Sequence, residues 1–339
     1  MNIPEDMIYS LHSISPSISS KLPSDMPLHG LLATDLALRV SSIDSPWLRV
    51  LPSEADFAAS LPFMWPEELQ KLLPGAAKSI LKRQQDKFQR ECDAVAAAFP
   101  DLMLDRSNKY RYFWLVVNTR SFFHETPEME DFKWEDKLCL LPMADLFNHS
   151  SHEGCKVTWW DDDGYTITAD RTYHAGEELC ISYGEHTNDF LLVEYGFTVP
   201  GSLNPHDAVG LDGVILPKLD QAQREALARQ DLLGGFKFHP GTGPCEKTRA
   251  AIARILQQRQ QEQMKGPSGD DDDNDEKTGG NELLESVLRE LLTIANERLE
   301  RLRTSSSDLQ DVGETAAHRG LLIQRWEQIS QIISKGIKV

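Results

Sequence analysis

The chain has 339 residues, of which 40% are hydrophobic, and a formal net charge of −18 at pH 7. Its length and hydrophobic content predict one large or two moderate domains with a packed core. The acidic balance argues against a protein that follows the phosphate backbone of a nucleic acid. It suits either solubility alone or a basic protein partner.

The cysteines are scattered, odd in number and never arranged as C-x-x-C: Cys92, Cys139, Cys155, Cys180 and Cys245. This usage predicts free thiols in a reducing compartment rather than disulfides or a zinc site. No apolar stretch is long enough to span a bilayer, and the first residues lack the pattern of a secretory signal. We therefore expect no metal and no membrane association, with the protein in the cytoplasm, the nucleus or both.

The N-terminal part predicts a strand followed by helices. Residues 1–14 have strand character, because apolar and polar side chains alternate in their second half. Residues 45–52 read Ser-Pro-Trp-Leu-Arg-Val-Leu-Pro. Pro66, followed by two glutamates, is typical of a helix start. Helical spacing of apolar residues then continues to about residue 96, with Gly75 as a break.

Residues 110–122 are locally ambiguous. Their β-branched and aromatic content favours a strand, whereas the pairs Tyr110/Trp114 and Phe113/Val117 have helical spacing. Arg120 is the strongly charged side chain between an apolar face and an aromatic pair, an unusual place for a guanidinium without a partner.

Two short blocks carry most of the information in the sequence. Asp-Leu-Phe-Asn-His-Ser occupies residues 145–150, and Gly-Glu-Glu-Leu-Cys-Ile-Ser-Tyr-Gly occupies residues 176–184. Between the blocks, residues 156–160 and 165–168 alternate as strands do. The Asp-Gly dipeptide that precedes the second of these runs is a strong signal for a β-hairpin turn.

The composition changes after Pro200. Residues 215–260 and 281–334 have helical patterns, the second range with two apolar stripes: Leu284, Leu288, Leu291, Ala295, Leu299 and Leu302, then Leu321, Leu322, Trp326, Ile329 and Ile333. The Gly- and Asp-rich residues between these patterns predict a disordered linker over about residues 262–280.

In this order, and with a hairpin between them, the two blocks resemble the core of the SET-domain methyltransferases of the Rubisco large-subunit lysine methyltransferase type. The resemblance implies an α+β fold: a SET-type β-fold over residues 1–200 with a helical insert at about residues 61–125. An all-α C-terminal substrate-binding domain over residues 201–339 follows. The resemblance also favours a helix over a strand at residues 110–122. The family has a strand and a Gly-x-Gly turn that this sequence does not contain, so we expect an N-terminally incomplete domain.

Methyl transfer to an amine is an in-line displacement that depends mainly on orientation and needs no metal. The resemblance implies that S-adenosylmethionine is the cofactor and that Tyr183 is catalytic, with a hydroxyl that polarises the methyl group. A Tyr at the end of a strand whose hydroxyl caps a turn is the alternative.

The same resemblance implies that Asn148, His149, Arg120 and Asp145 bind the cofactor. For Asn148 and His149 the alternative is a turn stabilised by side-chain hydrogen bonds. Arg120 and Asp145 could bind the two charged groups of the amino-acid end, or they could simply pair with each other.

The resemblance also implies that Tyr195 lines the substrate-lysine channel, although it could instead belong to the core. Phe197 could be channel wall or core. We therefore expect a monomeric protein-lysine N-methyltransferase that acts on a non-histone or ribosomal-type protein. A histidine N-methyltransferase of the same family and a catalytically inactive SET-like binding module are the alternatives.

Overall fold

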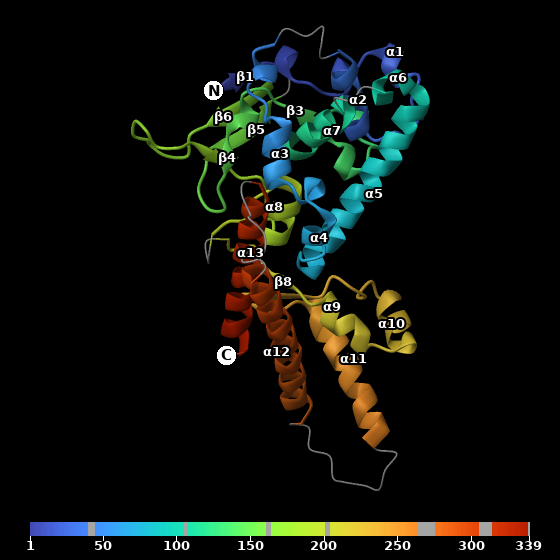
Figure 1. The fold of residues 1–339 in the computed structure, drawn as a ribbon, viewed down its shortest axis with the longest axis vertical. Helices are drawn as coiled ribbons and strands as arrows, with labels where there is room; N and C mark the ends of the chain where they lie inside the picture. The colour runs from blue at the N-terminus through green and yellow to red at the C-terminus, as the bar shows by residue number, and fades with distance from the viewer. Residues whose placement is uncertain are drawn as a thin grey trace. The chain divides into compact units, whose positions relative to one another are not determined.

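The computed structural model describes residues 1–39, 45–104, 108–160, 164–200, 204–263, 275–304 and 314–337. The chain divides into two compact units (Figure 1). The first comprises Met1–Ala58 and Lys82–Glu185, and the second comprises Ala59–Leu81 and His186–Val339.

The described residues of the first unit form three small sheets. An antiparallel sheet has the order β1-β6-β5, from Asn2–Ile3, Gly164–Thr168 and Lys156–Trp160. The β5–β6 pair confirms the predicted hairpin, although its turn residues 161–163 lie outside the described residues. Gly164 has φ +84°, and a Cβ there would overlap the carbonyl oxygen of Ile3, so only glycine lets β1 approach the hairpin this closely.

The other two sheets each have two strands. The antiparallel pair joins β2 (Ser121–Phe123) to β3 (Leu138–Leu140), and the parallel pair joins β4 (Asn148–His149) to β7 (Cys180–Ile181). The buried core against which the sheets pack is made of Ile3, Ile8, Cys139, Leu141, Ala144, Cys155, Tyr165, Ile167 and Ile181.

The prediction of strand structure over residues 1–14 was wrong beyond Ile3. After β1 the chain forms two 3-10 turns, Glu5–Met7 and Leu11–Ser13, and Tyr9 makes a single bridge to Leu140. The hydroxyl of Ser13 accepts from the amide of Ser10 at 3.1 Å and donates to the carbonyl of Ile8 at 3.0 Å. Local side-chain bonds of this kind offer the backbone an alternative to a β-ladder.

Helices account for most of the first 120 residues. They are α1 (Pro16–Ser19), α2 (Leu28–Arg39), α3 (Glu54–Ser60), α4 (Glu67–Gln70), α5 (Gly75–Ala98), α6 (Pro100–Leu104) and α7 (Lys109–Arg120). The ambiguous segment is thus a helix as far as Arg120, and this helix packs against α2. The expectation of a helix up to residue 122 was wrong, because the chain enters β2 at Ser121. The predicted break at Gly75 is the beginning of α5, and Pro66 is the N-cap of α4. Short 3-10 turns lie at Trp47–Arg49, Pro62–Met64, Pro127–Met129, Trp134–Asp136, Ala144–Leu146 and Leu216–Lys218.

The second unit is mainly helical. Its elements are α8 (Asn188–Tyr195), α9 (Asp212–Ile215), α10 (Gln221–Ala228), α11 (Glu246–Gln263), α12 (Asp275–Thr304) and α13 (Glu314–Ile337). The long helices α12 and α13 lie side by side, and their apolar stripes form much of the buried core of this unit (Figure 1). Within this core the indole Nε1 of Trp326 donates to the carbonyl of Leu72 at 2.8 Å. The α+β class with a helical C-terminal region is confirmed.

Two details of this region differ from the sequence analysis. It also contains an antiparallel sheet of order β10-β9-β8, from Gly243–Pro244, Lys237–His239 and Val209–Gly210. Of the expected linker, residues 264–274 lie outside the described residues, whereas 262–263 end α11 and 275–280 begin α12. Composition does not separate a polar helix end from a linker, because both are rich in Asp, Glu, Lys and Gly.

Candidate active site

The parallel pair of β4 and β7 brings the two sequence blocks together. Asn148 lies opposite Cys180, and His149 lies opposite Ile181. The amide of Ser150 extends the pairing by donating to the carbonyl of Ile181 at 2.8 Å. Because Tyr183 follows β7 by two residues, this register places it beside the Asn-His pair.

Tyr183 is held by two hydrogen bonds to the first block. Its hydroxyl donates to the carbonyl oxygen of Phe147 at 2.7 Å, and its backbone amide donates to Nδ1 of His149 at 3.1 Å. The two aromatic rings lie 5.2 Å apart. Since Nδ1 accepts a hydrogen bond, neutral His149 carries its proton on Nε2, which lies 2.9 Å from the hydroxyl oxygen of Ser151. The phenol of Tyr183 therefore has a defined position and direction.

Burial raises the pKa of Tyr183 above the ordinary value of a tyrosine. The positive charge of Arg120 lowers this pKa, whereas the negative charge of Asp145 raises it. The phenol is therefore neutral at physiological pH, and it can donate or accept a hydrogen bond but cannot act as a phenolate base there.

The side chain of Asn148 is exposed, and its Nδ2 donates to Oε1 of Glu178 at 2.5 Å. The sequence analysis did not predict Glu178 as a site residue. Its place in the second sequence block, five residues before Tyr183, was the signal that could have identified it. Glu178 and Cys180 also line a cavity of about 520 Å³, together with Ser150, His152, Glu153, Arg171 and Tyr173. A cavity of this volume is in the range of small-molecule sites.

Arg120 and Asp145 form an ion pair at the end of α7. Nη1 of Arg120 donates to the carbonyl oxygen of Asp145 at 2.5 Å and lies 3.3 Å from its Oδ2. The indole Nε1 of Trp47 donates to the same Oδ2 at 2.9 Å. Burial raises the pKa of Asp145, although the bonds from Trp47 and Arg120 oppose this effect.

This pairing leaves two polar atoms without a partner. Nε of Arg120 and Oδ1 of Asp145 are buried, and neither has a hydrogen-bond partner among the residues that the structure describes. Unpaired buried polar atoms are costly, so these two atoms retain unused hydrogen-bonding capacity. Trp47 was noticed in the sequence, but its contact with Asp145 spans 98 residues and left no local signal.

Tyr195 and Phe197 lie in the second unit, at the C-terminal end of α8. Their rings are 6.4 Å apart, on either side of Gly196, which caps the helix with φ +82°. Phe190 lies 6.3 Å from Tyr195, and His186 stacks on Phe190 at 4.1 Å. All four rings are partly exposed. The structure thus gathers five predicted site residues in the first unit and two in an aromatic group of the second.

Within the described ranges, no group of three or more His, Cys, Asp or Glu side chains is arranged to hold a metal ion. Over the same ranges, no helix combines the length and apolar character that crossing a membrane requires.

The sequence comparison finds similarity to a known domain over part of the chain. Residues 42–184 match the model of the SET domain. SET domain-containing protein 4 of Mus musculus is 29% identical over 245 residues, which cover 68% of this chain and 54% of the relative. The ribosomal lysine N-methyltransferase set11 of Schizosaccharomyces pombe is 36% identical over 107 residues, 31% of this chain and 26% of the relative. The chain spans about half the length of the mouse relative and less of the fission yeast one.

The structural comparison agrees with this assignment. The crystal structure of the SET domain of LSMT bound to MeLysine and AdoHcy matches with a TM-score of 0.62 and 16% identity, over 99% of this chain and 82% of that one. The structure of Rubisco LSMT bound to AdoMet matches with a TM-score of 0.59 and 16% identity, and the match covers 99% of this chain and 82% of that one. Residues 42–184 are therefore similar to a SET domain. The fold of the chain is that of the Rubisco LSMT structures, as the sequence blocks predicted.

Proposed function

We propose that this protein is an S-adenosylmethionine-dependent protein N-methyltransferase whose acceptor is a lysine amine on another protein. The observation that carries the proposal is the fixed phenol of Tyr183, which the Phe147 carbonyl and the His149 imidazole hold beside Asn148. Transfer between two bound groups depends on such orientation.

The charged groups of the site fit the amino-acid end of S-adenosylmethionine. That end carries one carboxylate and one ammonium, and the site offers a guanidinium Nε and a carboxylate Oδ1 that are buried without partners among the described residues. Arg120 would bind the carboxylate and Asp145 the ammonium, while Asn148 and His149 supply amide, imidazole and backbone groups for hydrogen bonds. When bound, the cofactor supplies an electrophilic methyl group on a sulfonium.

The protein residues orient and desolvate rather than form covalent bonds. The neutral hydroxyl of Tyr183 stays fixed by its bond to the Phe147 carbonyl, with lone pairs that remain able to accept a further hydrogen bond. An acceptor lysine must be uncharged, and aromatic walls favour the neutral amine because they desolvate the ammonium. Tyr195 and Phe197 are the residues that we assign to such a wall. The uncharged nitrogen, having lost its proton to solvent, would gain the methyl group as the carbon–sulfur bond breaks, and a neutral thioether would leave.

The acceptor belongs to a non-histone or ribosomal-type protein in this proposal, and the enzyme works as a monomer in the cytoplasm or the nucleus without nucleic acid or membrane. The name of the fission yeast relative, a ribosomal lysine N-methyltransferase, supports this choice. One specific observation favours a histidine acceptor instead: the actin-histidine N-methyltransferase of Danio rerio is 25% identical over 290 residues, 75% of this chain and 44% of the relative.

The test combines cofactor binding with transfer. Purified protein is titrated with S-adenosylmethionine by calorimetry and then incubated with methyl-labelled cofactor and a protein extract. We expect binding and labelled lysine in the wild type, and at least a tenfold loss of transfer in Tyr183→Phe, on the order of one lost transition-state hydrogen bond.

Tyr110→Phe is the matched control. Tyr110 is buried on α7, and its hydroxyl has no partner within the described part of the chain, so removing that oxygen leaves the site intact. Labelled histidine in place of labelled lysine would reassign the acceptor. If the folded protein binds no cofactor, we would conclude that it is a non-catalytic SET-like module and not an enzyme.

A further inference from the structure

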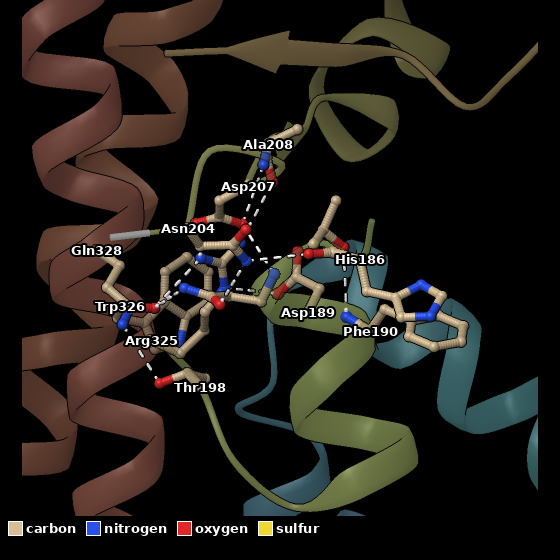
Figure 2. A network of polar contacts seen from close by, with 12 residues as sticks. His186, Asp189, Phe190, Thr198, Asn204, Asp207, Ala208, Arg325, Trp326 and Gln328 are labelled. Carbon is tan, nitrogen blue, oxygen red and sulfur yellow. Dashed lines mark hydrogen bonds and ion pairs between the residues drawn. The ribbon is translucent and has the colours of Figure 1, made fainter. Parts of the chain in front are cut away.

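A buried network of hydrogen bonds and ion pairs holds both ends of residues 188–199, the segment that contains the aromatic residues Phe190, Tyr195 and Phe197 (Figure 2). At the incoming end, the guanidinium Nε of Arg325 donates to Oδ1 of Asp189 at 2.8 Å. Its Nη1 donates to Oδ2 of Asp207 at 2.7 Å, and Oδ1 of Asp207 accepts from the backbone amide of Asn188 at 2.9 Å. Arg325 belongs to α13, whereas Asn188 and Asp189 form the first turn of α8.

The outgoing end of the segment is held by the next turn of α13. Nε2 of Gln328 donates to the carbonyl of Val199 at 3.0 Å, and its Oε1 accepts from Nδ2 of Asn188 at 2.9 Å. Oδ1 of Asn188 in turn accepts from the amide of Val199 at 3.1 Å. The amide side chain of Gln328 therefore joins the start of α8, the chain that leaves it and α13.

The network is buried and carries charge. The side chain of Arg325 is 0% exposed, and those of Asp189 and Asp207 are 2% and 3% exposed. Buried ionic groups contribute little net stability compared with apolar side chains of the same volume, but they tolerate few geometries because each charge requires its partners. Their effect here is to define where α8 lies on α13.

The fastened segment contains the residues assigned to the acceptor wall. Between Asn188 and Val199 lie Phe190, Tyr195 and Phe197, with Gly196 in a left-handed conformation. A Cβ at Gly196 would come within 2.8 Å of Cβ of Ser60, so the chain has little freedom at this turn. The positions of the rings thus follow from the two fastened ends.

We propose that Arg325 and Gln328 are positioning residues for acceptor binding, through their hold on the aromatic segment at residues 188–199. This inference rests on the proposed function, because it assumes that Tyr195 and Phe197 contact the acceptor. The C-terminal helix α13 then contributes to acceptor binding through the aromatic segment.

The experiment uses the full chain with Gln328→Met, which keeps the length of the side chain and removes its hydrogen bonds. Backbone hydrogen exchange is measured over residues 188–199, and methyl transfer is measured with free lysine as the acceptor. We expect exchange about tenfold faster in the segment. We also expect a KM for lysine about tenfold higher, with kcat and cofactor affinity within about twofold of wild type.

Two variants on the same helix serve as controls. Gln331→Met makes the same change at an exposed position, and Ile333→Val removes a methylene from the buried core without touching the network. Ile333→Val lowers the stability of the protein without changing the network. It therefore distinguishes an effect of lower stability from an effect of displacing residues 188–199.

Exchange or KM values in Gln328→Met that equal those of Ile333→Val would overturn the positioning role. If the wild type binds no cofactor and methylates no lysine, the proposed function fails and the acceptor role fails with it. Faster exchange in Gln328→Met would then show only that the network fastens the segment.

Discussion

The backbone amide of Tyr183 donates a 3.1 Å hydrogen bond to Nδ1 of His149. This bond joins the second sequence block to the first through a side chain, in addition to the backbone pairing of β4 and β7. It fixes both the tautomer of the imidazole and the backbone from which the phenol extends. His149 is therefore a positioning residue for Tyr183 as well as a candidate cofactor contact.

The position of the hydrogen-bond acceptor in the side chain at residue 149 leads to a specific prediction. In His149→Asn the amide oxygen lies close to where Nδ1 accepts, whereas in His149→Gln the amide lies closer to Nε2. We expect kcat to fall about tenfold in His149→Asn and about a hundredfold in His149→Gln, because only the first retains the bond to Tyr183. Steady-state kinetics with saturating cofactor measure this order. His174→Asn, at an exposed position, is the control, and equal activity of the two His149 variants would contradict the positioning role.

The raised pKa of Tyr183 predicts the shape of the pH profile. A raised pKa keeps the phenol neutral to higher pH, so its protonation does not change in the neutral and mildly alkaline range. With lysine as the proposed acceptor, the amine is the group that titrates, since a free lysine amine has a pKa of about 10.4 and reacts only when uncharged. We expect kcat/KM for free lysine to rise about tenfold per pH unit between about pH 7 and about pH 9. A fall of the rate within that interval would show that an ionised Tyr183 is inhibitory there.

Sequence reasoning reached the features that depend on short segments. The hairpin of β5 and β6 follows from alternation and an Asp-Gly turn, both local signals. For α7 the local pattern was ambiguous, because the helix is buried on several faces through Tyr110, Phe113 and Trp114 and shows no clear apolar stripe. The family resemblance decided this case.

The contacts that were missed join residues far apart in the chain. Arg325 lies 136 residues from Asp189 and 118 from Asp207. A signal for it existed, because Arg325 interrupts the apolar stripe between Leu322 and Ile329, but its partners could not be read from spacing. Trp47 and Asp145 are a second case of the same kind.

Arg325 gives a prediction about stability. Arg325→Met leaves two buried carboxylates without their cation, and we expect it to lower the free energy of unfolding by about 3–5 kcal/mol. The triple variant with Asp189→Asn and Asp207→Asn should recover most of this loss, because it removes the unpaired charges. Urea unfolding at neutral pH measures both. Arg303→Met, which removes an exposed ion pair with Glu327, should cost less than about 1 kcal/mol, and a similar cost at position 325 would contradict the account.

Stability in mild acid should depend on His29. Burial lowers the pKa of His29 to about 4, and the charge of Lys87 acts in the same direction. Between this value and the ordinary histidine pKa of about 6.5, the unfolded chain binds a proton that the folded chain does not, so stability falls as the pH falls.

We expect the free energy of unfolding to be about 2 kcal/mol lower at pH 5 than at pH 7.5 because of this one group. Urea unfolding at the two pH values measures the difference. His29→Gln should lose that part of the acid sensitivity even if its stability is lower at both pH values, whereas the exposed His174→Gln should keep it. An unchanged acid loss in His29→Gln would show that His29 is not the group responsible.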